Sequence, residues 1–153
     1  MNKKNTILII GNGSSVLNHD IGQTIDSYPV VARINNYKIN GYEKKIGSKT
    51  DIWFNGANSK LKTPKKIPKK TIVLIPSSIL AKKKNYLNEY VERRLKIKNL
   101  APTIVNINDI KKIEKTIDSE RLTTGLYSIL WALENYNEVV IHGFDFFIDS
   151  KGH

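Results

Sequence analysis

The chain has 153 residues and contains no cysteine. This absence excludes a disulfide framework, a thiolate nucleophile and a thiolate metal site, and it is compatible with a reducing compartment. Long hydrophobic runs are missing near the start, because the apolar run 6–10 is too short for a signal peptide or a membrane span. We therefore expect a cytoplasmic protein, built as a single α/β domain over residues 1–153.

Acidic residues are scarce: 14 Asp and Glu face 25 Lys and Arg, which gives a net charge of +11. Such an excess suits nucleic-acid binding, steering of an anionic small substrate, or attraction to an anionic membrane leaflet. Much of it lies in 60–70, expected to be a basic mobile loop, and in 81–84. Solvated loops explain it equally well, and the lack of aromatic residues in 60–70 disfavours stacking on single-stranded nucleic acid.

The sequence also lacks the usual metal and nucleotide motifs. It has no H-E-x-x-H, no close histidine pair and no D-x-D, so no metal site is predicted. The turn Gly11-Asn12-Gly13-Ser14-Ser15 follows an apolar run, yet Val16 replaces the third glycine of a dinucleotide fingerprint and a P-loop lysine is missing. Two readings stay open for this turn, a nest for one phosphate or an ordinary tight turn.

Six apolar, β-branched runs recur along the chain, and several are continuous rather than alternating. Such runs predict parallel strands covered on both faces, at 6–10, 30–35, 51–55, 71–75, 103–107 and 138–142. Helical periodicity predicts helices at 84–98, 108–117 and 123–136, the last capped by Thr123 or Thr124. The alternation predicts a Rossmann-like, doubly wound, mostly parallel sheet with helices on both faces.

Small polar residues follow several of these predicted strands. Asn35 and Asn55 end two of them, where a shared crevice could read a nucleobase edge or ribose hydroxyls. Thr123-Thr124-Gly125 opens an apolar helix and could bind a second anion. Gly143 repeats the glycine turn, and Asp145 could bind hydroxyls. Each segment taken alone also fits a structural role, as an asparagine turn, a helix cap or an aromatic plug.

Taken in order, segments 7–55 and 121–147 resemble sialyltransferases. The first resembles the large sialyl motif of the animal-type family, since the glycine turn precedes Ile25-Asp26-Ser27, Arg33-Ile34-Asn35 and Gly47-Ser48-Lys49-Thr50. The second, "LTTGLYSILWALENYNEVVIHGFDF", resembles the small sialyl motif. Bacterial lipooligosaccharide sialyltransferases share a similar skeleton, and segment 56–120 is unmatched.

The resemblance implies a GT-A-like variant fold and an inverting, metal-independent transferase that moves sialic acid from CMP-sialic acid to a surface glycan, without a cofactor. It implies a donor phosphate at the glycine turn, phosphate or sugar at the two asparagines, carboxylate or phosphate at the threonines, and cytidine and ribose after the last strand. The candidate donor-binding residues are Gly11, Asn12, Gly13, Ser14, Ser15, Asn35, Asn55, Thr123, Thr124, Gly125, Gly143, Phe144 and Asp145.

Two departures from the family pattern stand out. The animal-type family joins its motifs by a cysteine pair, which this chain lacks. The family's general base is a histidine beyond the small motif, and His153, the last residue, is the histidine in that region. His153 is thus the candidate catalytic residue, and we expect the C-terminal catalytic part to be missing.

The expected partners are a CMP-sugar donor and a glycan or glycolipid acceptor in lipopolysaccharide or capsule biosynthesis, with peripheral association at the inner face of the membrane and no nucleic acid. Three alternatives stay open. One is a transferase for another CMP-sugar such as Kdo. Another is a basic nucleic-acid-binding domain, which leaves the glycine turn and the polar strand ends unexplained. The third is a truncated, non-catalytic nucleotide-binding remnant.

Overall fold

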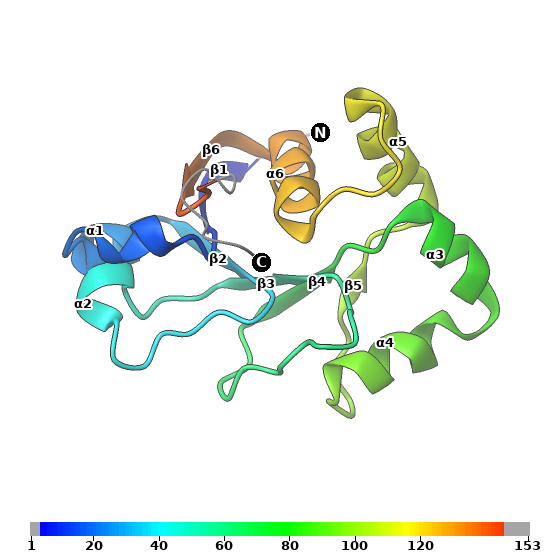
Figure 1. Cartoon of the computed structure of the whole chain (residues 1–153), viewed down its shortest axis with the longest axis horizontal. Helices are drawn as coiled ribbons and strands as arrows, with labels where there is room; N and C mark the ends of the chain where they lie inside the picture. Colours follow the sequence, from blue (N-terminus) through cyan, green and yellow to red (C-terminus); the bar gives the residue numbers. More distant parts are fainter. Residues whose placement is uncertain (1–3, 146–153) are drawn as a thin grey trace.

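The computed structural model describes residues 4–145, which form one six-stranded sheet (Figure 1). The strands are β1 (Lys4–Ile10), β2 (Val30–Ile34), β3 (Ile52–Asn55), β4 (Lys70–Val73), β5 (Thr103–Ile104) and β6 (Tyr136–His142). Their order is β5-β4-β3-β2-β1-β6, and every neighbouring pair is parallel. The predicted Rossmann-like α/β class is confirmed.

The strand order reverses at β1. The chain adds β2 to β5 on one side of β1 and then returns to place β6 on the other side. Ile7 of β1 therefore pairs with Val30 of β2 and with Val139 of β6. In open parallel sheets, ligands bind outside the carboxyl ends of the strands at such a switch point. A ligand site is therefore expected at the turns that follow β1 and β6.

Six α-helices and two 3-10 helices join the strands within residues 4–145. They are η1 (Ser14–Leu17), α1 (Gly22–Asp26), α2 (Glu43–Ile46), α3 (Ser77–Lys83), η2 (Lys84–Tyr86), α4 (Leu87–Leu95), α5 (Ile107–Ile117) and α6 (Thr124–Asn135). Figure 1 shows α1 and α2 together at one end of the molecule and α3 and α4 at the other. In the described part of the chain, no helix is long and apolar enough to cross a membrane.

The predicted helices 108–117 and 123–136 are confirmed, whereas 84–98 ends early. Lys96 adopts a left-handed conformation with φ of 56° and closes α4 after Leu95. The predicted strand 103–107 is also shorter, because Asn106 caps α5 by accepting a hydrogen bond from the Asp109 N–H group at 2.9 Å. The short helices α1, α2 and α3 lack the periodicity that would have revealed them.

The alternation of side chains along β1 divides the core in two. Ile7 and Ile9 belong to the larger cluster, which α6 covers. Leu8 and Ile10 point to the opposite face and pack with Ile25 of α1. Both faces of β1 are therefore buried, as its continuous apolar sequence predicts.

The basic loop before β4 is anchored by its apolar residues. Leu61 is 2% exposed, Pro68 is buried, and the Thr63 hydroxyl donates to the Leu95 carbonyl at the end of α4. The lysines of this loop, Lys60, Lys62, Lys65, Lys66 and Lys69, are exposed. The loop thus presents a basic surface, and its mobility stays a prediction.

A buried carboxylate ties three helices together. Glu114 of α5 is 5% exposed and accepts hydrogen bonds from the Ser77 N–H group at 3.0 Å and from the Ser77 hydroxyl at 2.6 Å. The Tyr127 hydroxyl in α6 donates to the same carboxylate at 2.8 Å. Burial raises the pKa of Tyr127, so this hydroxyl stays protonated at neutral pH. The network fixes the first turn of α6, which carries Thr124.

Tyr127→Phe removes one donor to Glu114 and leaves the ring in place. We expect the free energy of unfolding to fall by about 1–3 kcal/mol, since the carboxylate stays buried and loses a partner. Urea denaturation measures this change. Tyr86→Phe, at a tyrosine that is 41% exposed, serves as the control and should change little; equal stability of both variants would contradict the assignment.

Candidate functional site

The turns after β1 and β6 are joined by hydrogen bonds. The Gly11 N–H group donates to the His142 carbonyl at 2.7 Å, and the Gly13 N–H group donates to the Gly143 carbonyl at 2.8 Å. One turn further, the Ser15 N–H group and hydroxyl donate to the two carboxylate oxygens of Asp145, the former at 3.1 Å. Two segments that lie 130 residues apart in the sequence therefore form one unit at the switch point.

Glycine is required where these two turns meet. A methyl group on Gly11 would lie 2.6 Å from the Gly143 carbonyl oxygen, and one on Gly13 would lie 2.5 Å from the Asp145 carboxyl carbon. Gly143 itself has φ of +78°, a left-handed conformation that other residues rarely adopt. The absence of side chains thus lets the two backbones touch.

These contacts reduce the number of free N–H donors in the glycine turn, which the sequence allows to be either a phosphate nest or an ordinary tight turn. The N–H groups of Gly11, Gly13 and Ser15 already donate to segment 142–145. Within residues 4–145, the N–H groups of Asn12 and Ser14 make no hydrogen bond, and Ser14 is exposed. The N–H groups of Asn12 and Ser14 therefore stay available to an anion at this turn.

The asparagines at the strand ends brace the same edge of the sheet. The Asn12 amide donates to the Ile34 carbonyl at 2.9 Å, which links the glycine turn to β2. Asn35, with φ of 49°, accepts a bond from the Gly56 N–H group at 3.2 Å through Oδ1. Asn55 is fully buried, and its Nδ2 has no partner among the described residues. At this edge Asn35 is thus half-buried, Asn12 is exposed, and Asn55 lies in the interior.

The start of α6 lies against the end of β3 and against the turn after β6. The Thr123 hydroxyl caps the helix by accepting a bond from the Leu126 N–H group at 3.2 Å. A methyl group on Gly56 would lie 2.7 Å from the Thr124 hydroxyl oxygen, so Thr124 stands over the end of β3. Methyl groups on Gly11 and Gly125 would lie 3.2 Å and 3.0 Å from the ring of Phe144.

The structure therefore gathers the sequence-predicted segments 11–15, 35, 55, 123–125 and 143–145 at one edge of the sheet, around the half-buried Phe144 ring. His153 lies outside the described residues. The donor-binding roles of these side chains and the catalytic role of His153 stay predictions.

Other residues of the large motif form a frame rather than a ligand surface. The Asp26 carboxylate accepts hydrogen bonds from the N–H groups of Ser48 and Lys49, at 3.0 Å and 2.9 Å. Arg33 is 1% exposed and donates to the carbonyl oxygens of Ile46 and Lys49, at 2.8 Å and 3.0 Å. These bonds hold segment 46–49 beneath β2.

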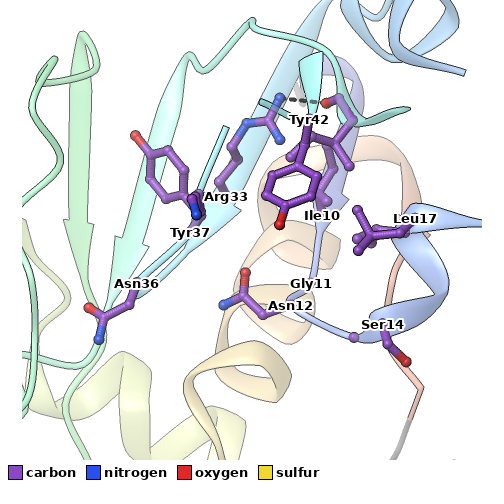
Figure 2. A pocket seen from close by; sticks show the side chains of 13 residues that line it. Ile10, Gly11, Asn12, Ser14, Leu17, Arg33, Asn36, Tyr37 and Tyr42 are labelled. Carbon is purple, nitrogen blue, oxygen red and sulfur yellow. Dashed lines mark hydrogen bonds between the residues drawn. The ribbon is translucent and has the colours of Figure 1, made fainter. Parts of the chain in front are cut away.

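A cavity of about 250 Å³ opens beside the glycine turn (Figure 2). It is lined by Ile10, Gly11, Asn12, Gly13, Ser14, Val16, Leu17, Arg33, Asn36, Tyr37, Lys38, Tyr42 and Ile46. The glycine turn was predicted from the sequence, but Tyr37 and Tyr42 were not, because they lie in a loop without periodicity. Figure 2 shows the Tyr42 ring, Leu17 and Asn12 around the hollow.

The site contains one carboxylate whose charge is defined by its hydrogen bonds, that of Asp145. The hydrogen bonds from Ser15 lower the pKa of Asp145, so this carboxylate is ionised at neutral pH. In the part of the chain that the structure describes, no group of three or more His, Cys, Asp and Glu residues is placed to hold a metal ion.

The fold and the site define a doubly wound α/β protein whose polar residues converge at the switch point of a parallel sheet. The family model of glycosyltransferase family 29 (sialyltransferase) matches residues 2–153, and the chain belongs to this family. The predicted resemblance to the animal-type family is confirmed.

Three comparisons place the chain among known proteins. It is 32% identical to CMP-N-acetylneuraminate-beta-galactosamide-alpha-2,3-sialyltransferase 1 of Gallus gallus, over 95% of this chain and 45% of the relative. A 50-residue segment is 44% identical to beta-1,6-galactosyltransferase GALT29A of Arabidopsis thaliana, covering 33% of this chain and 13% of the relative. A crystal structure of a mammalian sialyltransferase matches with a TM-score of 0.70 at 19% identity, over 92% of this chain and 55% of that one.

Gly143→Ala tests the requirement for glycine at the junction. The left-handed backbone costs about 1–2 kcal/mol for alanine, and contact of its methyl group with Val16 and Gly11 adds about 1–3 kcal/mol. Gly41→Ala is the matched control, since Gly41 has φ of +87° and open space around it. Thermal or urea unfolding of both variants gives the two losses of stability, and their difference is the steric contribution at Gly143. Equal losses of stability in the two variants would contradict the close contact of Gly143 with Gly11 and Val16.

Asp145→Asn tests the carboxylate that bonds Ser15. Because folding lowers the pKa of Asp145, the carboxylate stabilises the protein above its unfolded pKa of about 3.9, and this contribution is lost as the pH falls through the lowered value. We expect the difference in Tm between wild type and Asp145→Asn to be largest near neutral pH and to close in acid. A constant difference from pH 7 to pH 3 would refute this.

Proposed function

We propose that this chain binds CMP-sialic acid at the carboxyl edge of β1, β2 and β6 and serves the transfer of sialic acid to a glycan acceptor. The observation that carries the proposal is the convergence of the turns 11–15 and 143–145 with Asn35 and Thr124 at the switch point. The Gallus gallus relative is named for CMP-N-acetylneuraminate. Since this chain spans about half the length of that relative, substrates and reaction are part of the proposal.

The donor phosphate lies, in this proposal, between the glycine turn and the start of α6. The N–H groups of Asn12 and Ser14 offer two donors there. The 12-residue helix α6 adds the positive end of its dipole and the Thr124 hydroxyl. The Asn35 amide nitrogen is a further donor, because the hydrogen bond to Gly56 uses its oxygen.

These donors would stabilise the charge that develops on the departing CMP phosphate. Neutral N–H and O–H groups aimed at that charge supply the stabilisation that a metal ion gives in other transferases. We therefore propose an inverting, metal-independent transfer without a cofactor. His153 is proposed as the general base for the acceptor hydroxyl.

The cytidine and its ribose are assigned to the turn after β6. Gly143 packs against Gly11 and Val16 and so sets the course of this turn, and the nucleoside would contact the Phe144 ring, which borders both Gly11 and Gly125. The ionised Asp145 carboxylate keeps lone pairs free beyond its two bonds from Ser15, and these lone pairs can accept ribose hydroxyls.

The acceptor we propose is a glycan or glycolipid precursor of lipopolysaccharide or capsule, modified at the cytoplasmic face of a membrane. The exposed lysines of the loop before β4 support peripheral association, because each basic residue near an anionic leaflet contributes about 1 kcal/mol. The net charge of +11 also favours the approach of an anionic donor.

CMP and CMP-sialic acid should raise the melting temperature of the protein. Ligand at 100 times its Kd stabilises the folded state by about 2.7 kcal/mol. Asn35→Ala and Thr124→Val should abolish the shift, since each removes a proposed donor. Asn108→Ala, at an exposed position on α5, is the matched control and should keep the full shift.

A folded protein whose Tm is unchanged by millimolar CMP would overturn the proposal. Duplex binding with a steep dependence on salt, together with no CMP effect, would favour the nucleic-acid alternative. A panel of CMP-sugars in a hydrolysis assay separates sialic acid from Kdo as the transferred sugar.

A further inference from the structure

The positive charge of the protein is concentrated in one segment. Residues 60–98 contain 13 Lys and Arg and two acidic residues, whereas the rest of the chain contains 12 basic and 12 acidic residues. Segment 60–98 therefore carries the whole net charge of +11. A lysine-rich composition alone would spread the charge along the chain, so this uneven distribution favours a surface that meets an anionic partner.

The two basic parts of this segment pack together. The Thr63 hydroxyl of the loop before β4 donates to the Leu95 carbonyl of α4, and the Tyr90 hydroxyl of α4 donates to the Ala57 carbonyl at 3.4 Å. Figure 1 shows the loop and α4 on the lower side of the sheet, with α6 above it. We call loop 60–69 together with α3, η2 and α4 the basic surface. Its exposed cations are Lys60, Lys62, Lys65, Lys66, Lys69, Lys82, Lys84, Arg93, Lys96 and Lys98.

Two tyrosines lie among these cations. The Lys83 Nζ atom lies 5.3 Å from the ring centres of both Tyr86 and Tyr90, and the Arg94 guanidinium lies 5.2 Å from the Tyr90 ring centre. Tyr90 is half-buried, whereas Tyr86 is 41% exposed. Exposed tyrosines beside lysines suit a membrane interface, because the ring enters the headgroup region while the cations contact phosphate groups.

The acidic residues of the segment lie apart from these tyrosines. Glu89 and Glu92 line a hollow on α4 together with Arg93, Lys96, Ile97 and Lys98, and neither tyrosine borders this hollow. The side of the basic surface that carries Tyr86 and Tyr90 is therefore lined by cations and does not repel an anionic partner.

The basic surface begins at the cavity beside the glycine turn. The Asn36 side chain, which lines that cavity, donates to the Lys60 carbonyl at 3.0 Å and accepts a hydrogen bond from the Lys62 N–H group at 2.7 Å. A partner bound to the basic surface thus lies next to the crevice.

We propose that the basic surface docks on an anionic phospholipid bilayer, with Tyr86 at the level of the headgroups. The inference rests on the proposed function, which places a glycolipid acceptor at a membrane. It adds the surface that binds the lipid and an orientation in which the crevice opens beside the bilayer.

The composition of the surface favours lipid over nucleic acid. Lysine supplies 11 of the 13 cations of segment 60–98, and its compact charge suits a diffuse anionic leaflet better than the bidentate contacts that arginine makes to individual phosphates. Stacking on single-stranded nucleic acid uses several exposed rings, and Tyr86 is the one exposed aromatic residue within 60–98.

The test measures binding of the whole chain to vesicles by co-sedimentation. One set of vesicles contains phosphatidylcholine alone, and the other contains an equimolar mixture of phosphatidylcholine and phosphatidylglycerol. We expect binding to the second set alone, and this binding should weaken as salt is added, because salt screens exposed charges.

Two variants assign the binding to the basic surface. Lys65→Gln/Lys66→Gln should weaken binding by about 25-fold, since each lysine near an anionic leaflet contributes about fivefold. Lys111→Gln/Lys112→Gln removes the same charge from exposed positions on α5, outside the basic surface, and should keep the wild-type affinity.

Tyr86 is tested separately. Tyr86→Ala should weaken binding by about three- to tenfold, as expected for partial burial of an aromatic ring, and Tyr86→Phe should retain it. Thermal unfolding of each variant verifies that it is folded.

Three results would overturn the basic surface as a lipid site. The first is equal binding, or no binding, to the two sets of vesicles. The second is an equal loss of binding in the α5 variant and in the loop variant. The third is an oligonucleotide that binds more tightly than the anionic vesicles at the same salt concentration and is lost in the loop variant.

The shift of Tm with CMP separates this proposal from the proposed function. Lys65→Gln/Lys66→Gln should keep the full CMP shift, because these lysines lie outside the proposed donor site. Wild-type protein that shows the CMP shift without vesicle binding contradicts the lipid surface alone. Binding to anionic vesicles without any CMP shift supports the lipid surface and contradicts the proposed function.

Discussion

Two backbone hydrogen bonds, from Gly11 to His142 and from Gly13 to Gly143, hold the turn after β1 against the turn after β6. They form because these glycines lack side chains and because Gly143 adopts a left-handed conformation. Everything else at the crevice depends on this contact. It places Asp145 beside Ser15, brings the Phe144 ring against α6, and leaves the N–H groups of Asn12 and Ser14 free for a ligand.

Hydrogen-bond networks on both faces of the sheet stabilise the elements around these two turns. On one face, the Glu114 network fixes the first turn of α6 and so the position of Thr124. On the other face, Asp26 and Arg33 hold segment 46–49 under β2. Part of the large sialyl motif is therefore structural, and its role is to stabilise the strand end that carries Asn35. Arg33 also lines the cavity beside the glycine turn.

Much of this architecture could be predicted from the sequence, because short stretches of neighbouring residues determine the strands and the start of α6. Continuous Ile and Val runs identify buried parallel strands, and Thr123 marks the start of α6. The glycine turn and the polar strand ends pointed to one crevice. The order of the strands could not be predicted in the same way, because no local sequence pattern shows that β6 returns to pair with β1.

The features that escaped prediction are those created by tertiary contacts. The turn Gly11–Ser15 offered a full phosphate nest in the sequence, but segment 142–145 uses three of its N–H groups. Asn55 looked like a ligand and lies buried. Tyr37 and Tyr42 lie in a loop whose sequence shows no periodic pattern. A crystal structure with CMP tests the central claim most directly: the account predicts the phosphate between Asn12, Ser14 and Thr124, and a nucleotide bound elsewhere would contradict it.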